Sequence, residues 1–365
     1  MPSGDRHRLA TMTLSLDTYR LLGRSGLRVS PLALGAMTFG NDWGWGAERD
    51  EVRQILETYL DRGGNFVDTA DVYTDGSSER LLGELLRGRR ERVVLATKFT
   101  CSTYPGDPNA GGNHRRNMVR SVEASLRRLD TEYIDLLYLH AWDATTPVEE
   151  VLRGMDDLVR SGKVVYVGIS DTPAWQVSRM QAIADLRGWA PLVALQIEYS
   201  LVERTVEREL IPMAAELGLG VVPWSPLGSG VLTGKYTRAD LADAGDVAAP
   251  SGTRREVAAG NGTLTERNLG IAELVTKVAA ELGVTPAQAA LAWTLRNPAV
   301  TAPILGVRTL AQLDDNLGAL DVSFDDAQLA ALDEASSVDL GFPHEFLARP
   351  MTRTVMFGGV TIRPR

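Results

Sequence analysis

The 365-residue sequence has little cysteine and histidine, and it has no long apolar run. A single cysteine, Cys101, excludes an internal disulfide framework and a cysteine-rich metal site. The four histidines, His7, His114, His140 and His344, show no metal-ligand spacing, so no metal site is predicted. No stretch approaches about 18 consecutive apolar residues, which predicts that nothing spans a bilayer. The net charge of −9 argues against nucleic-acid and anionic-membrane partners. A soluble, cytoplasmic protein is expected.

Lysine is also scarce. Only four of the 38 basic residues are lysines, namely Lys98, Lys163, Lys235 and Lys277. A coding preference for arginine explains the imbalance. Because arginine and lysine are not interchangeable where a proton must move, each retained lysine is still a candidate for a specific role.

Short apolar runs alternate with amphipathic stretches along most of the chain. The runs are continuously apolar, which is typical of parallel strands that helices cover on both faces. The predicted strands are residues 32–35, 65–68, 92–98, 134–140, 164–170, 192–196, 219–224 and 302–306. The predicted helices are residues 49–61, 78–86, 117–129, 147–159, 173–186, 205–217, 266–282 and 310–319. Eight strand–helix repeats predict an α/β fold, a (β/α)8 TIM barrel. A doubly wound open sheet is the alternative.

Four further segments surround this pattern. Residues 19–29 read as a β-hairpin that caps the barrel floor. Residues 239–262, after the seventh strand, form a long loop without periodicity, and such loops are usually functional. Residues 1–17 lack the apolar region of a secretory signal and stay unassigned. Residues 18–340 are expected to form one barrel domain, followed by a tail, 341–365, that can lie over the active site.

Polar residues follow the predicted strands at their carboxyl ends, where barrels of this type carry catalytic groups. Asp68, Lys98 and His140 end three runs, and Tyr73 follows Asp68 closely. A nearby ammonium favours phenolate and so lowers the pKa of a tyrosine, and a carboxylate positions that ammonium. A histidine can donate a hydrogen bond to a substrate oxygen. Together the four residues suit protonation of an oxygen while hydride reaches its carbon.

Each of the four residues has an ordinary alternative when taken alone. Asp68 could cap a helix, Tyr73 could pack, Lys98 could be a solvated strand end, and His140 could be structural. The set is more specific than its members, because four independent accidents at the correct strand ends are improbable.

Several segments carry a family resemblance. They are Gly35–Gly40, Asn65–Tyr73, Ser78–Gly83, Ala96–Lys98, Asp135–His140, Gly162–Ser170, Gln196–Ser200, Pro223–Gly230 and Gly306–Arg308. Over roughly residues 19–320 the sequence resembles the aldo-keto reductases. The resemblance implies a barrel that holds NADPH across its mouth, with Tyr73 as the general acid and Lys98, held by Asp68, lowering its pKa. His140 would orient the carbonyl of a small-molecule substrate.

The resemblance also implies the residues that hold the cofactor. Ser170, Asp171 and Gln196 would bind the nicotinamide carboxamide, and Trp224 would stack on the ring. The other expected contacts are Gly35, Ala36, Met37, Asp68, Ser225, Pro226, Leu227, Gly228, Gly230, Lys235, Gly306, Arg308, Gln312, Asp315 and Asn316. Because position 140 is His and not Glu, carbonyl reduction is favoured over C=C reduction.

Two arginines can be argued from chemistry as well. Arg308 precedes a predicted helix, where its guanidinium and the helix N–H groups suit a 2′-phosphate, which favours NADPH over NADH. Arg254, in the long loop, is a second candidate for this phosphate, or else a solvated charge. Trp43 and Trp45 are either exposed or line an aromatic substrate pocket, together with Tyr73, His140 and Trp142.

Gly228-Ser-Gly230 is not a dinucleotide fingerprint, because it lacks the third glycine and follows the seventh strand, not the first. Two other functions stay open. Similarity to the β-subunits of potassium channels leaves an NADPH-binding regulatory subunit as an alternative. A reductase of a keto-sugar nucleotide is another. The sequence does not reveal the substrate, the physiological direction or whether the chain forms homo-oligomers.

Overall fold

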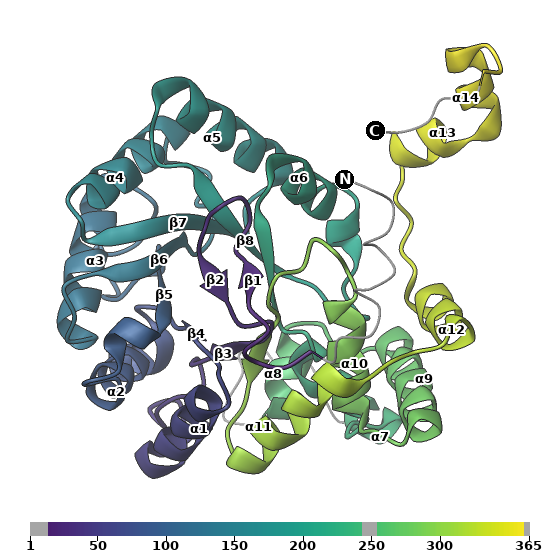
Figure 1. The fold of residues 1–365 in the computed structure, drawn as a ribbon, viewed down its shortest axis with the longest axis horizontal. Helices are drawn as coiled ribbons and strands as arrows, with labels where there is room; N and C mark the ends of the chain where they lie inside the picture. Colours follow the sequence, from purple (N-terminus) through teal and green to yellow (C-terminus); the bar gives the residue numbers. More distant parts are fainter. Residues whose placement is uncertain (1–13, 243–253, 361–365) are drawn as a thin grey trace.

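A computed structural model describes residues 14–242 and 254–360 (Figure 1). Eight parallel strands form one sheet in the order β10-β3-β4-β5-β6-β7-β8-β9. The two edge regions meet where Val221 of β9 pairs with Val300, just before β10. The strands are β3 (Ala33–Gly35), β4 (Phe66–Asp68), β5 (Val94–Phe99), β6 (Ile134–Leu139), β7 (Val164–Ser170), β8 (Leu192–Glu198), β9 (Gly220–Trp224) and β10 (Ile304–Gly306). The (β/α)8 barrel is therefore confirmed, and the open doubly wound sheet is excluded.

Helices surround the barrel. They are α1 (Arg49–Asp61), α2 (Ser77–Leu85), α3 (Arg115–Arg128), α4 (Val148–Arg160), α5 (Ala174–Arg187), α6 (Leu210–Leu217), α7 (Arg238–Ala242), α8 (Arg254–Gly260), α9 (Glu266–Leu282), α10 (Pro286–Leu295), α11 (Leu310–Leu317) and α12 (Asp326–Ser336), followed by α13 (His344–Ala348) and α14 (Pro350–Phe357). Seven of the eight predicted helices match within about two residues at each end, the ordinary disagreement over helix termini.

The remaining predicted helix, 205–217, is wrong in its first half. Residues Thr205–Glu207 form a 3-10 turn, and α6 begins only at Leu210. Pro212 explains the break, because it has no N–H to bond a carbonyl four residues earlier and is tolerated only in the first turn of a helix. The long loop is also more ordered than expected, since α7 and α8 occupy its two ends; residues 243–253 lie outside the described residues.

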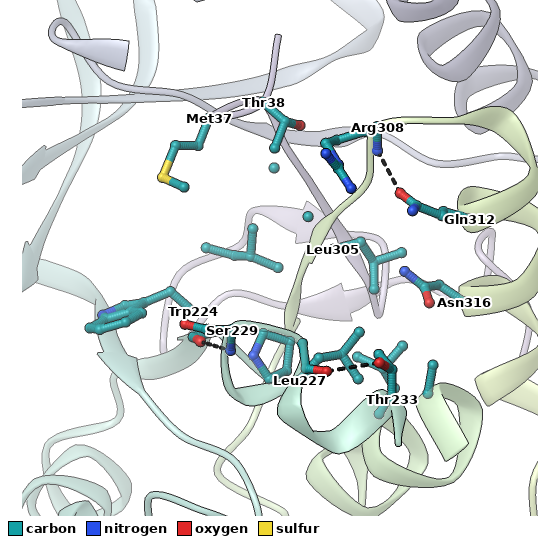
Figure 2. A pocket seen from close by; sticks show the side chains of 18 of the residues that line it. Met37, Thr38, Trp224, Leu227, Ser229, Thr233, Leu305, Arg308, Gln312 and Asn316 are labelled. Atoms are coloured by element: carbon teal, nitrogen blue, oxygen red, sulfur yellow. Dashed lines mark hydrogen bonds between the residues drawn. The ribbon is translucent and has the colours of Figure 1, made fainter. Parts of the chain in front are cut away.

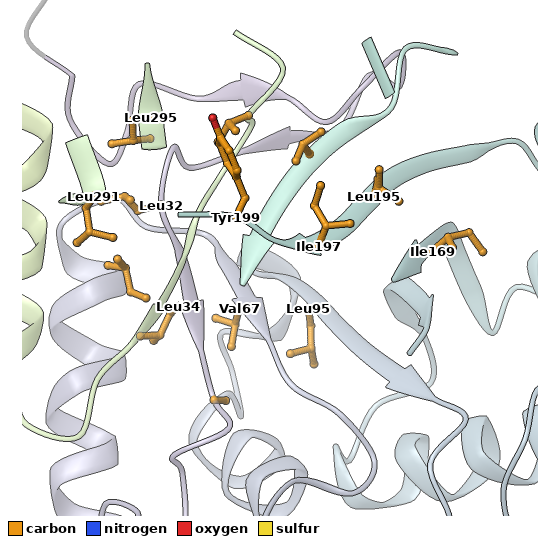
Figure 3. Packing of buried hydrophobic residues seen from close by; sticks show 14 of the residues in the cluster. Leu32, Leu34, Val67, Leu95, Ile169, Leu195, Ile197, Tyr199, Leu291 and Leu295 are labelled. Atoms are coloured by element: carbon orange, nitrogen blue, oxygen red, sulfur yellow. The ribbon is translucent and has the colours of Figure 1, made fainter. Parts of the chain in front are cut away.

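Successive strand residues point to opposite faces, and this alternation builds two cores. Residues such as Phe66, Ala96 and Leu136 fill the barrel interior. Their neighbours Val67 and Leu95 pack outward against the helices, in the layer that Figure 3 shows. Both faces of the strands are thus apolar, which is why their sequences are continuous apolar runs.

The predicted hairpin is present. β1 (Arg20–Leu21) pairs antiparallel with β2 (Arg28–Val29). Its turn lies against the amino ends of β8 and β9, where a Cβ on Gly23 would be only 2.4 Å from the carbonyl oxygen of Val193. Gly23 also has φ +58°, so glycine is required there on both counts. Leu22, fully buried, joins the interior core and closes the barrel floor.

Candidate active site

The carboxyl ends of β4, β5 and β6 bring the four predicted residues together. Asp68 ends β4, Lys98 lies one residue before the end of β5, and His140 directly follows β6. Tyr73 opens a short 3-10 turn after β4. Because parallel strands of a barrel all end at one face, residues that are 72 positions apart at most become neighbours there.

The Lys98 ammonium is fully buried and has three acceptors around it. It contacts Asp68 Oδ1, lies 2.9 Å from the carbonyl oxygen of Thr69, and lies 3.2 Å from the Tyr73 hydroxyl. An ammonium has three N–H donors, so all three are matched. Gln196 Nε2 donates to the other oxygen of Asp68 at 2.9 Å, which fixes the carboxylate. Burial alone would lower the pKa of Lys98, but Asp68 and Tyr73 outweigh it and raise that pKa.

Tyr73 lies next to the Lys98 ammonium and is in ring contact with Trp43 and His140. Burial raises the pKa of Tyr73, and the Lys98 charge opposes this increase. The ammonium thus acts in the expected direction, but its effect is smaller than that of burial, so the phenol is protonated at neutral pH. Donation from Lys98 to the hydroxyl oxygen leaves the phenol proton available to a ligand.

His140 stands beside Tyr73 as a neutral imidazole. The two rings meet edge to face, with centroids 5.8 Å apart. Burial and the Lys98 charge lower the pKa of His140 to about 3. Cys101 Sγ lies 3.6 Å from its Nδ1. An uncharged imidazole can donate one hydrogen bond without bringing a second positive charge beside Lys98.

A cavity of about 620 Å³ runs from these residues along the barrel mouth to α11. Figure 2 shows it between the segment that follows β9 and the start of α11, with Trp224 near one end and Arg308 near the other. Seventeen of the twenty predicted cofactor residues line it: Gly35, Met37, Asp68, Ser170, Asp171, Gln196, Trp224, Ser225, Pro226, Leu227, Gly230, Lys235, Gly306, Arg308, Gln312, Asp315 and Asn316. The structure therefore collects them in one elongated space.

Three predicted cofactor residues are not in that lining. Ala36 is fully buried in the outer core, and its carbonyl oxygen accepts a hydrogen bond from Ser78 at 2.7 Å. Gly228 is turned away, since a Cβ there would be 2.6 Å from the Val202 side chain. The Arg254 side chain lies outside the described residues.

Two residues in the left-handed backbone region flank the Trp224 side of the cavity. Asp171 has φ 36° and Ser225 has φ 51°, values that non-glycine residues rarely adopt. Asp171 Oδ1 accepts a hydrogen bond of 3.0 Å from the Trp224 indole. Asp171 thus orients the indole, a contact that the sequence did not predict.

The three tryptophans predicted for the substrate pocket lie around the cavity and do not line it. Trp43 is half-buried, with its ring centroid 6.5 Å from that of Tyr73 and 5.7 Å from that of Trp45. Trp142 packs on the outer core. Of the three, Trp43 is the one in ring contact with Tyr73.

At the α11 end the helix N–H groups are less available than expected. The Glu51 carboxylate accepts from Leu310 N at 2.6 Å, and the Thr309 side chain accepts from Gln312 N. Gln312 in turn accepts from Arg308 N at 2.9 Å. These donors are already used, whereas the Arg308 guanidinium lines the cavity at this end.

Several cavity residues were not predicted. They are Thr38, Ser229, Thr233, Val257, Asn261, Thr285, Pro286, Ala287, Leu291, Ile304 and Leu305. Most lie in the 3-10 turn Gly228–Thr233 that follows β9, or in or beside helices α8 and α10. No local pattern marks them, because their place in the cavity depends on how those helices pack against that turn.

Asp71 is the second missed feature, and it is a buried carboxyl behind the site. Neither of its oxygens has a hydrogen-bond partner of ordinary geometry among the described residues. Burial, assisted by the nearby Glu79 carboxylate, raises the pKa of Asp71 to about 7, and the Ser121 side chain, Arg128 and Lys98 offset only part of this. The sign of this buried carboxyl in the sequence is an acidic residue shortly after the predicted strand 65–68.

We expect Asp71→Asn to stabilise the protein at pH 8 and to lose this advantage toward pH 4. The folded-state pKa lies above the unfolded value, so the folded state of the wild-type protein loses stability as pH rises from about 4 to above 7. A rise of about 3 pKa units means that ionised Asp71 lowers the free energy of unfolding by roughly 4 kcal/mol. Because a buried asparagine amide keeps part of that burial cost, we expect the variant to gain about 1–3 kcal/mol in the free energy of unfolding. Urea unfolding at pH 5 and pH 8 measures it. Asp61→Asn, at an exposed position, is the control, and an equal effect of both variants would contradict the assignment.

Among the described residues, none of the helices is both long and apolar enough to cross a lipid bilayer.

Comparison with known proteins identifies the family. Residues 31–337 match the model of the Aldo/keto reductase family. The chain is 36% identical to norsolorinic acid reductase of Aspergillus flavus over 350 residues, which covers 93% of this chain and 86% of that protein. It is 40% identical to the uncharacterized oxidoreductase YrpG of Bacillus subtilis over 328 residues, 87% of this chain and 95% of that protein. Identity to an aryl-alcohol dehydrogenase [NADP(+)] of Phanerodontia chrysosporium is 35% over 334 residues, 87% and 86% of the two chains. The chain belongs to the aldo/keto reductase family and is an oxidoreductase.

Proposed function

We propose that this enzyme reduces an aromatic aldehyde or ketone with NADPH and that Tyr73 supplies the proton. The observation that carries the proposal is the Asp68–Lys98–Tyr73 contact chain at one end of the cavity, with neutral His140 beside it. Each member has a partner that fixes it, and the phenol faces the space where a carbonyl can enter.

The lining of the cavity fits a nicotinamide dinucleotide. Ser170 Oγ is buried and has no hydrogen-bond partner among the described residues, which suits a carboxamide. Trp224 offers a flat face that Asp171 orients, and Arg308 offers a guanidinium for phosphate at the far end. When bound, reduced nicotinamide supplies the hydride.

The residues of the chain then protonate and orient the carbonyl oxygen of the substrate. Tyr73 donates its proton as the carbonyl oxygen gains charge, and Lys98 stabilises the phenolate that forms. His140 donates a hydrogen bond to the same oxygen and orients it. Asp68 keeps the ammonium in place, and Gln196 keeps Asp68 in place.

Trp43 supports an aromatic substrate. It stands edge-on to Tyr73, next to Trp45, so a planar ring bound at the phenol would contact indole surface. The relative named aryl-alcohol dehydrogenase [NADP(+)] acts, by that name, on alcohols that carry an aromatic ring. Together these observations favour an aromatic carbonyl over a keto-sugar nucleotide.

The direct test is NADPH oxidation with a panel of aromatic aldehydes, aromatic ketones, quinones and keto-sugar nucleotides. We expect aromatic carbonyls to give the highest kcat/KM. A Trp43→Ala variant should lose part of that preference and keep turnover of small aliphatic aldehydes. Absence of turnover with every carbonyl, despite NADPH binding, would overturn the proposal and favour a regulatory role.

Arg308→Ala should raise KM for NADPH by roughly 10- to 100-fold and leave kcat nearly unchanged. A charge-assisted hydrogen bond to phosphate contributes about 1.5–3 kcal/mol, and NADH lacks the phosphate concerned. The KM for NADH should therefore change little. Steady-state kinetics with both cofactors measures the effect. Arg62→Ala is a matched control, because Arg62 pairs with Asp314 on the exposed side of α11. Equal losses with both cofactors would refute the 2′-phosphate contact.

A further inference from the structure

His140 can orient a carbonyl only from a ring nitrogen that carries a proton. Burial and the Lys98 charge lower the pKa of His140 to about 3, so near pH 7 the imidazole has one N–H donor and one acceptor nitrogen. A protonated nitrogen can donate to the substrate oxygen, whereas a lone pair at the same place would repel that oxygen. Which nitrogen is protonated is set by the hydrogen bond that the other nitrogen makes.

Cys101 supplies that second hydrogen bond. Its Sγ lies 3.6 Å from Nδ1 of His140, and the ring has no other hydrogen bond among the described residues. Burial, assisted by the Asp71 carboxylate, raises the pKa of the Cys101 thiol, so the sulfur keeps its proton at neutral pH. A sulfur atom is a weak acceptor and an unprotonated imidazole nitrogen an ordinary one, so the S–H donates and Nδ1 accepts.

Thr100, the residue before Cys101, holds this contact in place. Its φ of 131° is a value that β-branched residues rarely adopt. The Thr100 hydroxyl donates to Asn113 Oδ1 at 2.7 Å and accepts from the backbone N–H of His140 at 3.2 Å. Strained backbone of this kind persists only where the surrounding structure fixes it, and it is common at active sites. The hydroxyl thus ties the residue after β5 to the residue after β6.

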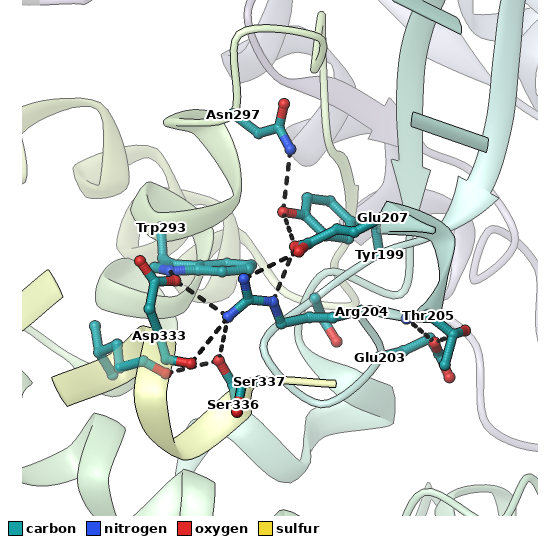
Figure 4. A network of polar contacts seen from close by, with 12 residues as sticks. Tyr199, Glu203, Arg204, Thr205, Glu207, Trp293, Asn297, Asp333, Ser336 and Ser337 are labelled. Carbon is teal, nitrogen blue, oxygen red and sulfur yellow. Dashed lines mark hydrogen bonds and ion pairs between the residues drawn. The ribbon is translucent and has the colours of Figure 1, made fainter. Parts of the chain in front are cut away.

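The hydrogen bonds around His140 end at the cavity, unlike those of a second polar network in the molecule. Figure 4 shows Arg204 bonded to Glu207 and Ser336, and Glu207 also accepts from the Tyr199 hydroxyl at 2.9 Å. None of these four residues lines the cavity, and their polar groups bind one another. The ring of His140 does line the cavity, and its Nε2 is left for a ligand.

We propose that Cys101 is a positioning residue for the carbonyl reduction: its S–H donates to Nδ1 of His140 and thereby keeps the imidazole proton on Nε2, the nitrogen that meets the substrate oxygen. This inference rests on the proposed function. Cys101 does not line the cavity, so it acts through His140. Without the thiol, part of the molecules would carry the proton on Nδ1 and present a lone pair to the carbonyl. Both forms of the ring are neutral, so NADPH binding should not change.

Nitrogen-15 NMR of the histidine rings tests the position of the proton directly. The chain has four histidines, so comparison with a His140→Gln variant identifies the His140 signals. In the wild-type protein we expect Nε2 at the chemical shift of a protonated ring nitrogen and Nδ1 at that of an unprotonated one. In Cys101→Ala both shifts should move toward their average. A wild-type proton on Nδ1, or a proton that stays wholly on Nε2 in Cys101→Ala, would overturn the proposal.

Kinetics tests the consequence for the reaction. Cys101→Ala should lower kcat/KM for carbonyl reduction by about 3- to 10-fold, the range that one ordinary hydrogen bond provides, and leave the Kd for NADPH unchanged. Cys101→Ser should retain more activity than Cys101→Ala, because a hydroxyl can also donate to Nδ1. A Cys101→Ser enzyme that is as slow as Cys101→Ala, although its His140 proton lies on Nε2, would refute the role of Cys101.

Ser336→Ala is the control for the loss of a buried hydrogen bond. Ser336 is fully buried, donates to the carbonyl oxygen of Leu332 at 2.6 Å and accepts from Arg204 at 2.7 Å. This variant should unfold at a lower urea concentration and keep the wild-type kcat/KM and the wild-type His140 shifts. An equal fall in kcat/KM would mean that general destabilisation explains the effect of Cys101→Ala, and the positioning role would fail.

The two measurements separate this inference from the proposed function. A wild-type protein without carbonyl turnover would end the proposed function, and the NMR spectrum would still show which nitrogen of His140 carries the proton. Carbonyl turnover by a wild-type protein with its proton on Nδ1 would leave the proposed function standing and overturn the role of Cys101 alone.

Discussion

Tyr73→Phe should lower kcat for carbonyl reduction by about 10³-fold while leaving the Kd for NADPH within a few-fold of the wild-type value. General acid catalysis contributes typically 10²- to 10⁴-fold, and phenylalanine removes the proton without changing the ring. The ring keeps its contacts with Trp43 and His140, so the shape of the site should persist. Stopped-flow measurement of NADPH oxidation, with cofactor binding followed by tryptophan fluorescence, separates the two effects.

Tyr138→Phe is the matched control for this variant. Tyr138 is also fully buried in the barrel, and its hydroxyl has no hydrogen-bond partner among the described residues. Its removal should change kcat little. If Tyr73→Phe retained more than about a tenth of the activity, the proton would have to come from another group, and the role proposed for Tyr73 would fail.

Lys98→Arg should lower kcat by at least about 10²-fold although the positive charge is kept. The Lys98 ammonium is completely buried and bonds to Asp68, Thr69 and Tyr73. A guanidinium is planar and larger, so it cannot point three donors at these acceptors within the same volume. The phenolate formed at Tyr73 would then lose its closest stabilising charge.

Lys163→Arg provides the control for this substitution. Lys163 forms a half-exposed ion pair with Glu123, and such a pair tolerates either cation. We expect wild-type kcat and KM for this variant. Near-normal activity of Lys98→Arg would show that charge alone is sufficient at position 98 and would refute the requirement for a compact ammonium.

The barrel could be predicted because its signals are local. Strands such as Ile134–Leu139 are apolar on both faces, and helices such as α1 alternate apolar and polar residues with helical spacing. The prediction failed in the 205–217 segment, where Pro212 overrides the amphipathic pattern. It also omitted α12, α13 and α14, since the sequence gives no indication of what their apolar residues pack against.

The four residues of the candidate site could be predicted for a similar reason. Each comes at or just after the end of a strand, and a parallel barrel brings all such ends to one face. The cavity beyond them was only partly predictable. Asp171 orients Trp224 through a backbone conformation that no sequence pattern reveals, and Glu51 reaches the first turn of α11 from α1.

The sequence by itself determined the order and type of the elements, the acid, base and aromatic groups at the strand ends, and the scarcity of lysine that singles out Lys98. Only the tertiary structure decided which donors and acceptors are already satisfied. It showed that three acceptors match the Lys98 ammonium, that the buried Asp71 oxygens have no hydrogen-bond partner of ordinary geometry among the described residues, and that the tail leaves its own barrel. These properties depend on desolvation and on contacts between distant segments, and both arise only when the chain is packed.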